Sequence, residues 1–341
     1  MLDDLKYIHE RDAQDALGLA EKQWQQLEYN FAINMPAQKP DNIVFAGMGG
    51  SALAALMSTS WPGHDLPFEI CRNYDIPKYV DDKTLFIASS YSGNTEETLS
   101  ALMVAEAKGA RIAIITSGGK LADIAKAKNY PMATLPAGIQ PRYAVFYNFR
   151  ALATILEQIG TVNSALEELS QASGFLKDIT SAWRPDVSTK DNYAKQLALE
   201  IVGKSPVVYS GPLLFPAAYK WKINFNENAK NIAWCNQYPE FNHNEFLGWT
   251  SSPAEKPYVV IDLRSSLENL RVQKRFEITE RLLSGKRPAP QIVKAMGTSI
   301  LEHLLWTITL GDFVSLYLAL LNGLNPTPVD LIEKLKLAMD E

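Results

Sequence analysis

Residues 85–98 carry the feature that most constrains this chain: a short apolar run, a turn and the start of a helix. The run at 85–88 (Leu-Phe-Ile-Ala) is long enough for a buried strand of a parallel sheet. Gly93 marks the turn. Asn94 is expected to cap a helix, because Glu97 follows three residues later, as in a capping box. The stretch therefore predicts strand, turn and helix in that order.

Three hydroxyl side chains lie in this predicted turn: Ser90, Ser92 and Thr95. Hydroxyls and backbone N–H groups at the N-terminus of a helix suit an anion, above all a phosphate. A serine-rich capped turn that binds no ligand is the alternative interpretation.

The same order of strand, turn and helix repeats through residues 41–135. Strands are predicted at residues 42–46, 68–72, 85–88 and 112–115. A second turn, at 47–52, is rich in small residues that let the backbone approach a ligand closely. This alternation predicts an α/β fold with a doubly wound parallel sheet flanked by helices. Ligands of such sheets bind beyond the carboxyl ends of the strands, so the two turns are expected to share one pocket.

The second half of the chain repeats the alternation with weaker turn chemistry. Strands are predicted within residues 206–211, 258–263 and 292–293, and helices at 144–182, at 193–202 and after Thr327. The turn at 209–212 lacks a clear phosphate-binding pattern, which predicts one phosphate site per chain, in the first domain. We place the domain boundary near residue 185, giving an N-terminal domain over 1–185 and a C-terminal domain over 186–341.

Composition bounds the class of protein. A length of 341 residues fits two domains, and a net charge of -5 without a lysine/arginine block argues against a nucleic-acid binder. Cys71 and Cys235 make no metal-spaced pair and favour a reducing compartment. The N-terminus lacks the apolar core of a signal peptide. The most apolar segment, 300–324, is interrupted by charged residues and predicts a buried helix. We therefore expect a cytoplasmic enzyme with no membrane or nucleic-acid partner.

Carboxylates and a histidine gather in two polar segments, 224–230 and 239–245. Carboxylate and imidazole are the usual proton carriers near neutral pH, so a catalytic role is favoured over a plain polar loop. The residues concerned are Glu227, Glu240, His243 and Glu245. A metal site formed by His243 with Glu240 and Glu245 is a weaker alternative, because no second histidine has ligand spacing.

Gly47, Gly49 and Ala52 match a loose dinucleotide-binding fingerprint after a predicted strand. That fingerprint expects an acidic residue at the end of the next strand, where residues 71–75 are ambiguous. A nicotinamide cofactor would also leave the hydroxyls of the 90–95 turn unexplained. A small phosphorylated ligand is therefore favoured, without a cofactor.

Several motifs, in chain order, resemble those of known families. The segments 49–51, 90–95 and 115–119 resemble the sugar isomerase (SIS) domain, a phosphosugar-binding α/β fold. Residues 141–143, 226–228, 242–245 and 335–336 extend the likeness to the bifunctional phosphoglucose/phosphomannose isomerases, over nearly the whole chain.

The resemblance implies two SIS-like domains in a homodimer that interconverts glucose 6-phosphate, mannose 6-phosphate and fructose 6-phosphate through a cis-enediol, without a metal. It implies that the sugar phosphate is held by Gly50, Ser51, Ser90, Ser92 and Thr95. Glu227 would then move the proton between C1 and C2, and Arg142 would stabilise the charge of the intermediate. His243, offered by the neighbouring subunit, and Lys336 would assist ring opening.

Three other functions fit parts of the sequence. A non-catalytic SIS-domain sensor of phosphosugars is the main alternative, although no basic DNA-binding segment precedes the domain. A glucosamine-phosphate amidotransferase would need an N-terminal nucleophilic cysteine, and position 2 is leucine. A nucleotide-dependent dehydrogenase rests only on the loose fingerprint.

Overall fold

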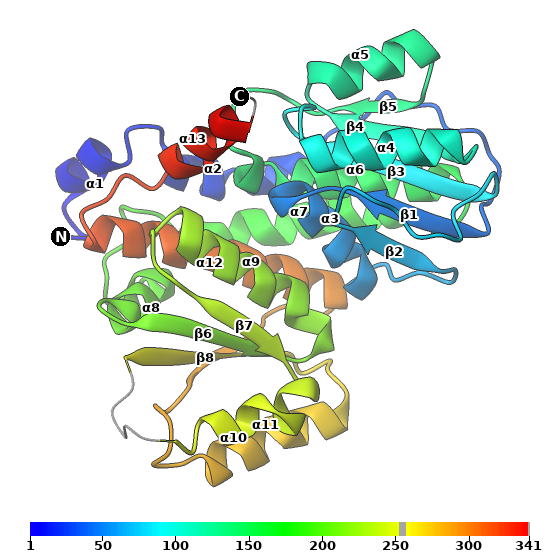
Figure 1. The fold of residues 1–341 in the computed structure, drawn as a ribbon. Coiled ribbons are helices and arrows are strands. Elements are labelled where there is room, and N and C mark those ends of the chain that lie inside the picture. The colour runs from blue at the N-terminus through cyan, green and yellow to red at the C-terminus, as the bar shows by residue number, and fades with distance from the viewer. Residues whose placement is uncertain (252–256, 340–341) are drawn as a thin grey trace. The chain divides into compact units, whose positions relative to one another are not determined.

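The structure is a computed structural model that describes residues 1–251 and 257–339. The chain folds into two compact units. The first unit is Lys22–Phe175, and the second combines Met1–Glu21 with Leu176–Glu341. Each unit holds one parallel sheet flanked by helices (Figure 1), which confirms the expected pair of doubly wound α/β domains.

The first unit is built on a five-stranded sheet in the order β2-β1-β3-β4-β5. Its strands are β1 Asn42–Ala46, β2 Phe68–Cys71, β3 Thr84–Ser90, β4 Arg111–Thr116 and β5 Met132–Thr134. Its helices are η1 Gln23–Glu28, α3 Gly49–Ser60, α4 Glu96–Ala107, α5 Gly119–Lys128, η2 Pro141–Tyr143, α6 Val145–Gln158 and most of α7 Ala165–Thr180.

Helices cover both faces of this sheet, so its central strand β3 is buried along its whole length. Side chains of a strand alternate between faces. Ile87 therefore packs in a core with Leu152 of α6, whereas its neighbour Phe86 packs in the opposite core with Leu102 of α4 and Leu121 of α5. Burial on both faces explains why the sequence of this strand is a continuous apolar run.

The second unit has a four-stranded parallel sheet in the order β7-β6-β8-β9. Its strands are β6 Ser205–Ser210, β7 Trp234–Gln237, β8 Tyr258–Arg264 and β9 Gln291–Lys294. Its helices are α1 Leu5–Arg11, α2 Ala16–Glu21, η3 Ser181–Trp183, α8 Tyr193–Ile201, η4 Pro212–Leu214, α9 Phe215–Glu227, η5 Glu240–His243, α10 Glu245–Gly248, α11 Leu270–Leu282, α12 Ile300–Leu321 and α13 Asp330–Met339.

Helix α12 is the core helix of the second unit. It begins at a capping box, in which Ser299 and Glu302 exchange hydrogen bonds with each other's backbone N–H groups. Its length and composition would suffice to cross a membrane, but 94% of its most apolar window is buried inside the protein. The expected buried helix is thus confirmed.

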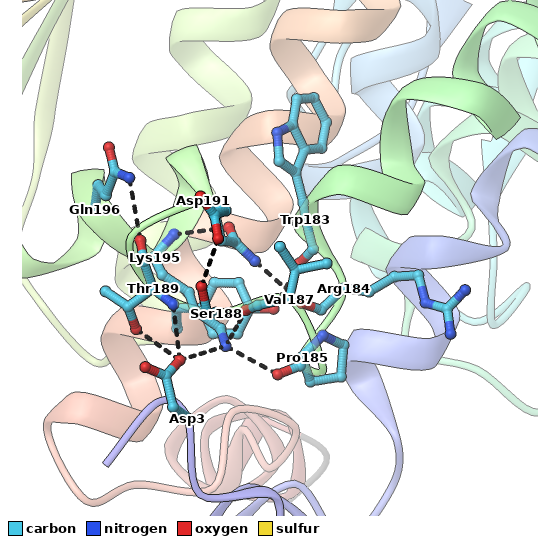
Figure 2. A network of polar contacts seen from close by, with 12 residues as sticks. Asp3, Trp183, Arg184, Pro185, Val187, Ser188, Thr189, Asp191, Lys195 and Gln196 are labelled. Carbon is cyan, nitrogen blue, oxygen red and sulfur yellow. Dashed lines mark hydrogen bonds and ion pairs between the residues drawn. The ribbon is translucent and has the colours of Figure 1, made fainter.

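The N-terminal segment belongs to the second unit, which differs from the expected division at residue 185. Lys195 of α8 is fully buried, and its Nζ donates to Asp3 Oδ1 (3.1 Å) and to the carbonyl oxygens of Pro185 (2.9 Å) and Val187 (2.7 Å), as Figure 2 shows. Tyr7 adds a hydrogen bond from its hydroxyl to the carbonyl of Leu320 (2.6 Å). The bonds of Asp3 and Tyr7 join residues far apart in the sequence, so no local pattern predicts them.

Candidate active site

The two predicted turns of the first unit lie side by side because their strands do. Strands β1 and β3 pair in parallel, with Ala46 opposite Ala88, so both chains leave the sheet at the same edge. Helix α3 begins at Gly49 and helix α4 begins after Thr95, the N-cap residue. The N-cap residue is therefore Thr95, not Asn94 as the sequence suggested, and Asn94 Oδ1 instead accepts the N–H of Lys120 (3.0 Å).

The hydroxyls of these turns form one cluster. Ser90 Oγ lies 2.7 Å from Thr95 Oγ1 and 3.4 Å from Ser92 Oγ. Ser51, from the other turn, accepts the N–H of Tyr91 on its Oγ (3.2 Å). The predicted phosphate residues of both turns are thus brought together at the start of two helices, where backbone N–H groups and the helix dipole favour an anion.

Arg142 lies against the same turns. A Cβ at Gly50 would sit 2.9 Å from the carbonyl oxygen of Pro141 and 3.3 Å from the N of Arg142, so only glycine allows this approach. Arg142 is almost completely buried, and its guanidinium lies over the ring of Tyr143, 4.6 Å from the centroid. The first unit therefore holds six of the predicted site residues in one neighbourhood.

Glu227 is the last residue of α9 in the second unit, and its side chain is half-buried. The helix end is fixed by Lys230, whose Nζ donates to the carbonyl oxygens of Glu227 (2.9 Å), Asn325 (3.2 Å) and Pro326 (3.0 Å). A cation on the last carbonyls stabilises a helix C-terminus. The carboxylate of Glu227 is thus carried by a firmly held backbone.

A buried polar network lies two turns earlier on α9. Lys220 forms an ion pair with Asp312 of α12, and both side chains are fully buried. Asn224 donates to the same carboxylate from its Nδ2 (2.5 Å). Sequence reasoning missed this network, although a charged residue inside an apolar helix such as α12 signals a buried partner.

His243 ends the short helix η5 and is exposed, whereas its neighbours are anchored. Asn242 accepts from Arg275 Nη1 (3.1 Å) and donates to Thr279 Oγ1 (3.0 Å). Phe241 is buried in the core of the second unit. The imidazole therefore projects from a fixed segment and is available to a ligand or a partner.

Glu240 and Glu245 each have partners of their own. Glu240 Oε1 accepts from Asn244 Nδ2 (2.6 Å), and Glu245 accepts from the hydroxyl of Tyr209 and from Asn236 Nδ2 (2.6 Å). No group of three or more His, Cys, Asp or Glu side chains that could hold a metal occurs within residues 1–251 and 257–339.

Lys336 lies on α13, whose residues are all exposed as far as they are described. Its Nζ pairs with Glu333 Oε1 at 2.9 Å, one turn earlier. Four apolar residues of this helix are exposed as well: Leu331, Ile332, Leu335 and Met339. The predicted site residues thus divide between the units, with Glu227, His243 and Lys336 on separate elements of the second.

Comparison with known families assigns a domain class to each half of the chain. The SIS domain family matches residues 37–161, and the bacterial phospho-glucose isomerase C-terminal SIS domain matches residues 190–339. The chain is therefore a protein of two SIS domains. A solved structure of a glucose-6-phosphate isomerase like protein from Thermus thermophilus has the same fold, with a TM-score of 0.67 at 20% identity over 97% of this chain and 98% of that one.

Similar curated proteins narrow the class to a family. The chain is 38% identical to a bifunctional phosphoglucose/phosphomannose isomerase of Caldicellulosiruptor bescii, over 90% of this chain and 92% of that protein. It also shares 39% identity with a D-glucosamine-6-phosphate 4-epimerase of Sulfolobus acidocaldarius, over 62% of this chain and 65% of that protein. This chain belongs to the bifunctional phosphoglucose/phosphomannose isomerase family and is an isomerase.

Proposed function

We propose that this isomerase interconverts fructose 6-phosphate with both glucose 6-phosphate and mannose 6-phosphate through a cis-enediol. The observation that carries the proposal is the hydroxyl cluster of Ser51, Ser90, Ser92 and Thr95 at two helix starts, in a chain of this family. Such a cluster suits the phosphate of a sugar, and phosphate binding at one end of the substrate positions the reacting end.

The reaction moves one proton between C1 and C2, which calls for one positioned carboxylate and a cation near the developing oxyanion. We assign the carboxylate to Glu227 and the cation to Arg142. The assignment is supported by the half-buried place of Glu227 on a fixed helix end and by the burial of Arg142 beside Gly50. This acid–base chemistry requires neither a metal nor a nucleotide.

Ring opening precedes the proton transfer, and we assign it to His243 and Lys336. His243 is exposed on an anchored segment, which suits a residue offered to the active site of a second subunit in a homodimer. Lys336 is exposed on α13. We further propose that the enzyme works in the cytoplasm on phosphorylated hexoses, with one substrate phosphate bound per chain by the first unit.

The assigned base is tested with Glu227→Gln, which keeps the shape of the side chain but removes its basicity. We expect kcat to fall by about 100- to 10,000-fold, the usual contribution of a general base, with KM for fructose 6-phosphate little changed. Glu240→Gln, at an exposed carboxylate nearby in sequence, is the matched control and should keep normal turnover. Normal turnover in Glu227→Gln would show that Glu227 is not the catalytic base.

A second candidate function follows from the similarity to a D-glucosamine-6-phosphate 4-epimerase. Incubating the protein with glucosamine 6-phosphate separates the two: we expect no C4 epimer to form. A faster reaction with glucosamine 6-phosphate than with fructose 6-phosphate would favour the epimerase. Binding of both sugars without any turnover would instead indicate a phosphosugar sensor.

A further inference from the structure

Asn242, the residue before His243, attaches the short helix η5 to helix α11. Its amide uses both of its polar atoms: Nδ2 donates to Thr279 Oγ1 at 3.0 Å, and Oδ1 accepts from Arg275 Nη1 at 3.1 Å. Arg275 and Thr279 are four residues apart on α11, so they lie on the same face of that helix. The amide is therefore held at two points, which fix both its position and its orientation.

Apolar packing against α11 supports this attachment. Phe241 precedes Asn242 and is buried in a core that also contains Phe276 of α11. Tyr238 lies against both of these rings, with centroid distances of 5.1 Å to Phe241 and 4.2 Å to Phe276. The backbone that leads into His243 thus has little freedom to shift relative to α11.

The hydroxyl of Thr279 connects two different elements. Threonines within helices often bond only to the carbonyl oxygen one turn earlier, and the buried Thr309 of α12 donates in this way to Leu305 at 2.9 Å. Thr279 is also buried, with 2% of its surface exposed, but its hydroxyl accepts from the side chain of Asn242 in η5. Removal of this hydroxyl would therefore release one of the two points that hold the residue next to His243.

The imidazole of His243 is exposed, so its direction depends on the backbone that carries it. The chain after it is held as well, because Glu245 accepts from Asn236 Nδ2 at 2.6 Å. A general acid or base acts only within hydrogen-bond reach of the proton that it moves. The attachment of Asn242, directly beside the histidine, therefore bears on what the imidazole can reach.

We infer that Thr279 is a positioning residue for His243: through Asn242, it fixes where the imidazole is offered to the sugar ring. The inference rests on the proposed role of His243 in ring opening. A displacement near 1 Å at a reacting group can cost about 100-fold in rate. Loss of the Thr279 hydroxyl should therefore slow ring opening and leave the proton transfer assigned to Glu227 intact.

The test separates ring opening from proton transfer by the choice of substrate. The ring of fructose 6-phosphate closes through the oxygen on C5, so 5-deoxyfructose 6-phosphate cannot close that ring. Thr279→Val keeps the shape of the side chain and removes the hydroxyl. We expect kcat/KM for fructose 6-phosphate to fall by about 10- to 100-fold. Exchange of deuterium into C1 of the 5-deoxy sugar, followed by NMR in deuterated water, should keep the rate of the unchanged protein.

Three further variants complete the test. Thr279→Ser restores the hydroxyl and should restore the rate with fructose 6-phosphate. Thr309→Val removes a buried hydroxyl of α12 and is the matched control, which should behave as the unchanged protein with both sugars. Asn242→Ala breaks the same contact from a half-buried position. It should show the same dependence on the substrate as Thr279→Val, and it decides the question if Thr279→Val does not fold.

His243→Ala distinguishes failure of this inference from failure of the proposed function. If His243→Ala is slow with fructose 6-phosphate while Thr279→Val and Asn242→Ala are as fast as the unchanged protein, Thr279 does not position His243. Equal losses with both sugars in Thr279→Val would indicate a general disturbance of the fold and would also overturn the inference. If His243→Ala itself keeps the full rate, the role proposed for His243 is wrong and the inference fails with it.

Discussion

The hydroxyl oxygens of Ser90 and Thr95 lie 2.7 Å apart, one at the end of β3 and the other at the N-cap of α4. The N–H of Gly93 also donates to Ser90 Oγ (3.1 Å), so the turn between them is held in one conformation. A site arranged in advance loses little entropy when a ligand binds. This pair therefore marks the phosphate end of the proposed substrate site.

The first prediction concerns this pair. The double variant Ser90→Ala/Thr95→Val removes both hydroxyls and keeps the side-chain volumes nearly constant. Hydrogen bonds to a charged group contribute about 1.5–3 kcal/mol each, so the loss of two should raise KM for fructose 6-phosphate by about 100-fold or more. Steady-state kinetics measures this. Ser100→Ala, farther along α4, is the control. An unchanged KM in the double variant would show that the phosphate binds elsewhere.

The second prediction concerns Gly50. In Gly50→Ala the new Cβ would meet the carbonyl oxygen of Pro141 at 2.9 Å and displace the segment that carries Arg142. A displacement near 1 Å at a reacting group can cost about 100-fold in rate, so we expect kcat to fall by about 10- to 100-fold. Gly118→Ala, in a turn with open space around the glycine, should retain its rate. Equal rates in the two variants would contradict the tight packing of Arg142 on this turn.

The third prediction concerns the buried ion pair of Lys220 and Asp312. Lys220→Met removes the buried cation that is paired with the Asp312 carboxylate and should lower the free energy of unfolding by about 3–5 kcal/mol. Lys220→Met/Asp312→Leu should recover much of that loss, because no charge remains. Lys83→Met breaks an exposed pair with Asp41 and should cost about 1 kcal/mol or less. Urea unfolding of the three variants provides the measurement, and an equal loss in both single variants would refute the account.

The fourth prediction concerns pH. His64 stacks on Phe68 with ring centroids 3.9 Å apart, and burial lowers the pKa of His64 from 6.5 to about 4. The unfolded chain therefore binds this proton more tightly than the folded protein does. The contribution of His64 is complete above pH 6.5 and is lost as the pH falls toward 4.

The measurement is the free energy of unfolding as a function of pH for the unchanged protein and for His64→Phe, which keeps the stacking but cannot titrate. The unchanged protein should lose about 1–3 kcal/mol more than the variant across this pH range. His9→Gln, at an exposed histidine, is the control. Parallel curves for His64→Phe and the unchanged protein would show that His64 is not held neutral.

Local patterns predicted most of the fold. Buried strands such as β3 could be predicted because they are apolar runs. Helix α12 could be predicted from its length and its apolar composition. The association of residues 1–21 with the second unit could not be predicted, because it depends on long-range contacts such as Asp3 with Lys195.

Candidate site residues could be predicted from the sequence where they are neighbours in the chain. Hydroxyl residues in a glycine-containing turn after a strand indicate an anion site from the sequence alone. The role inferred for Thr279 was not foreseen, because its partner Asn242 lies 37 residues away in the sequence and meets it only through packing. The same holds for Lys220, whose partner is 92 residues away in the sequence.

The central claim is tested most directly by adding fructose 6-phosphate to the purified protein in deuterated water with EDTA and following the sugars by NMR. The account predicts that glucose 6-phosphate and mannose 6-phosphate both accumulate, each with deuterium at C2. If fructose 6-phosphate binds but neither aldose forms, the protein is not the proposed isomerase, and the roles assigned to Glu227 and Arg142 are wrong.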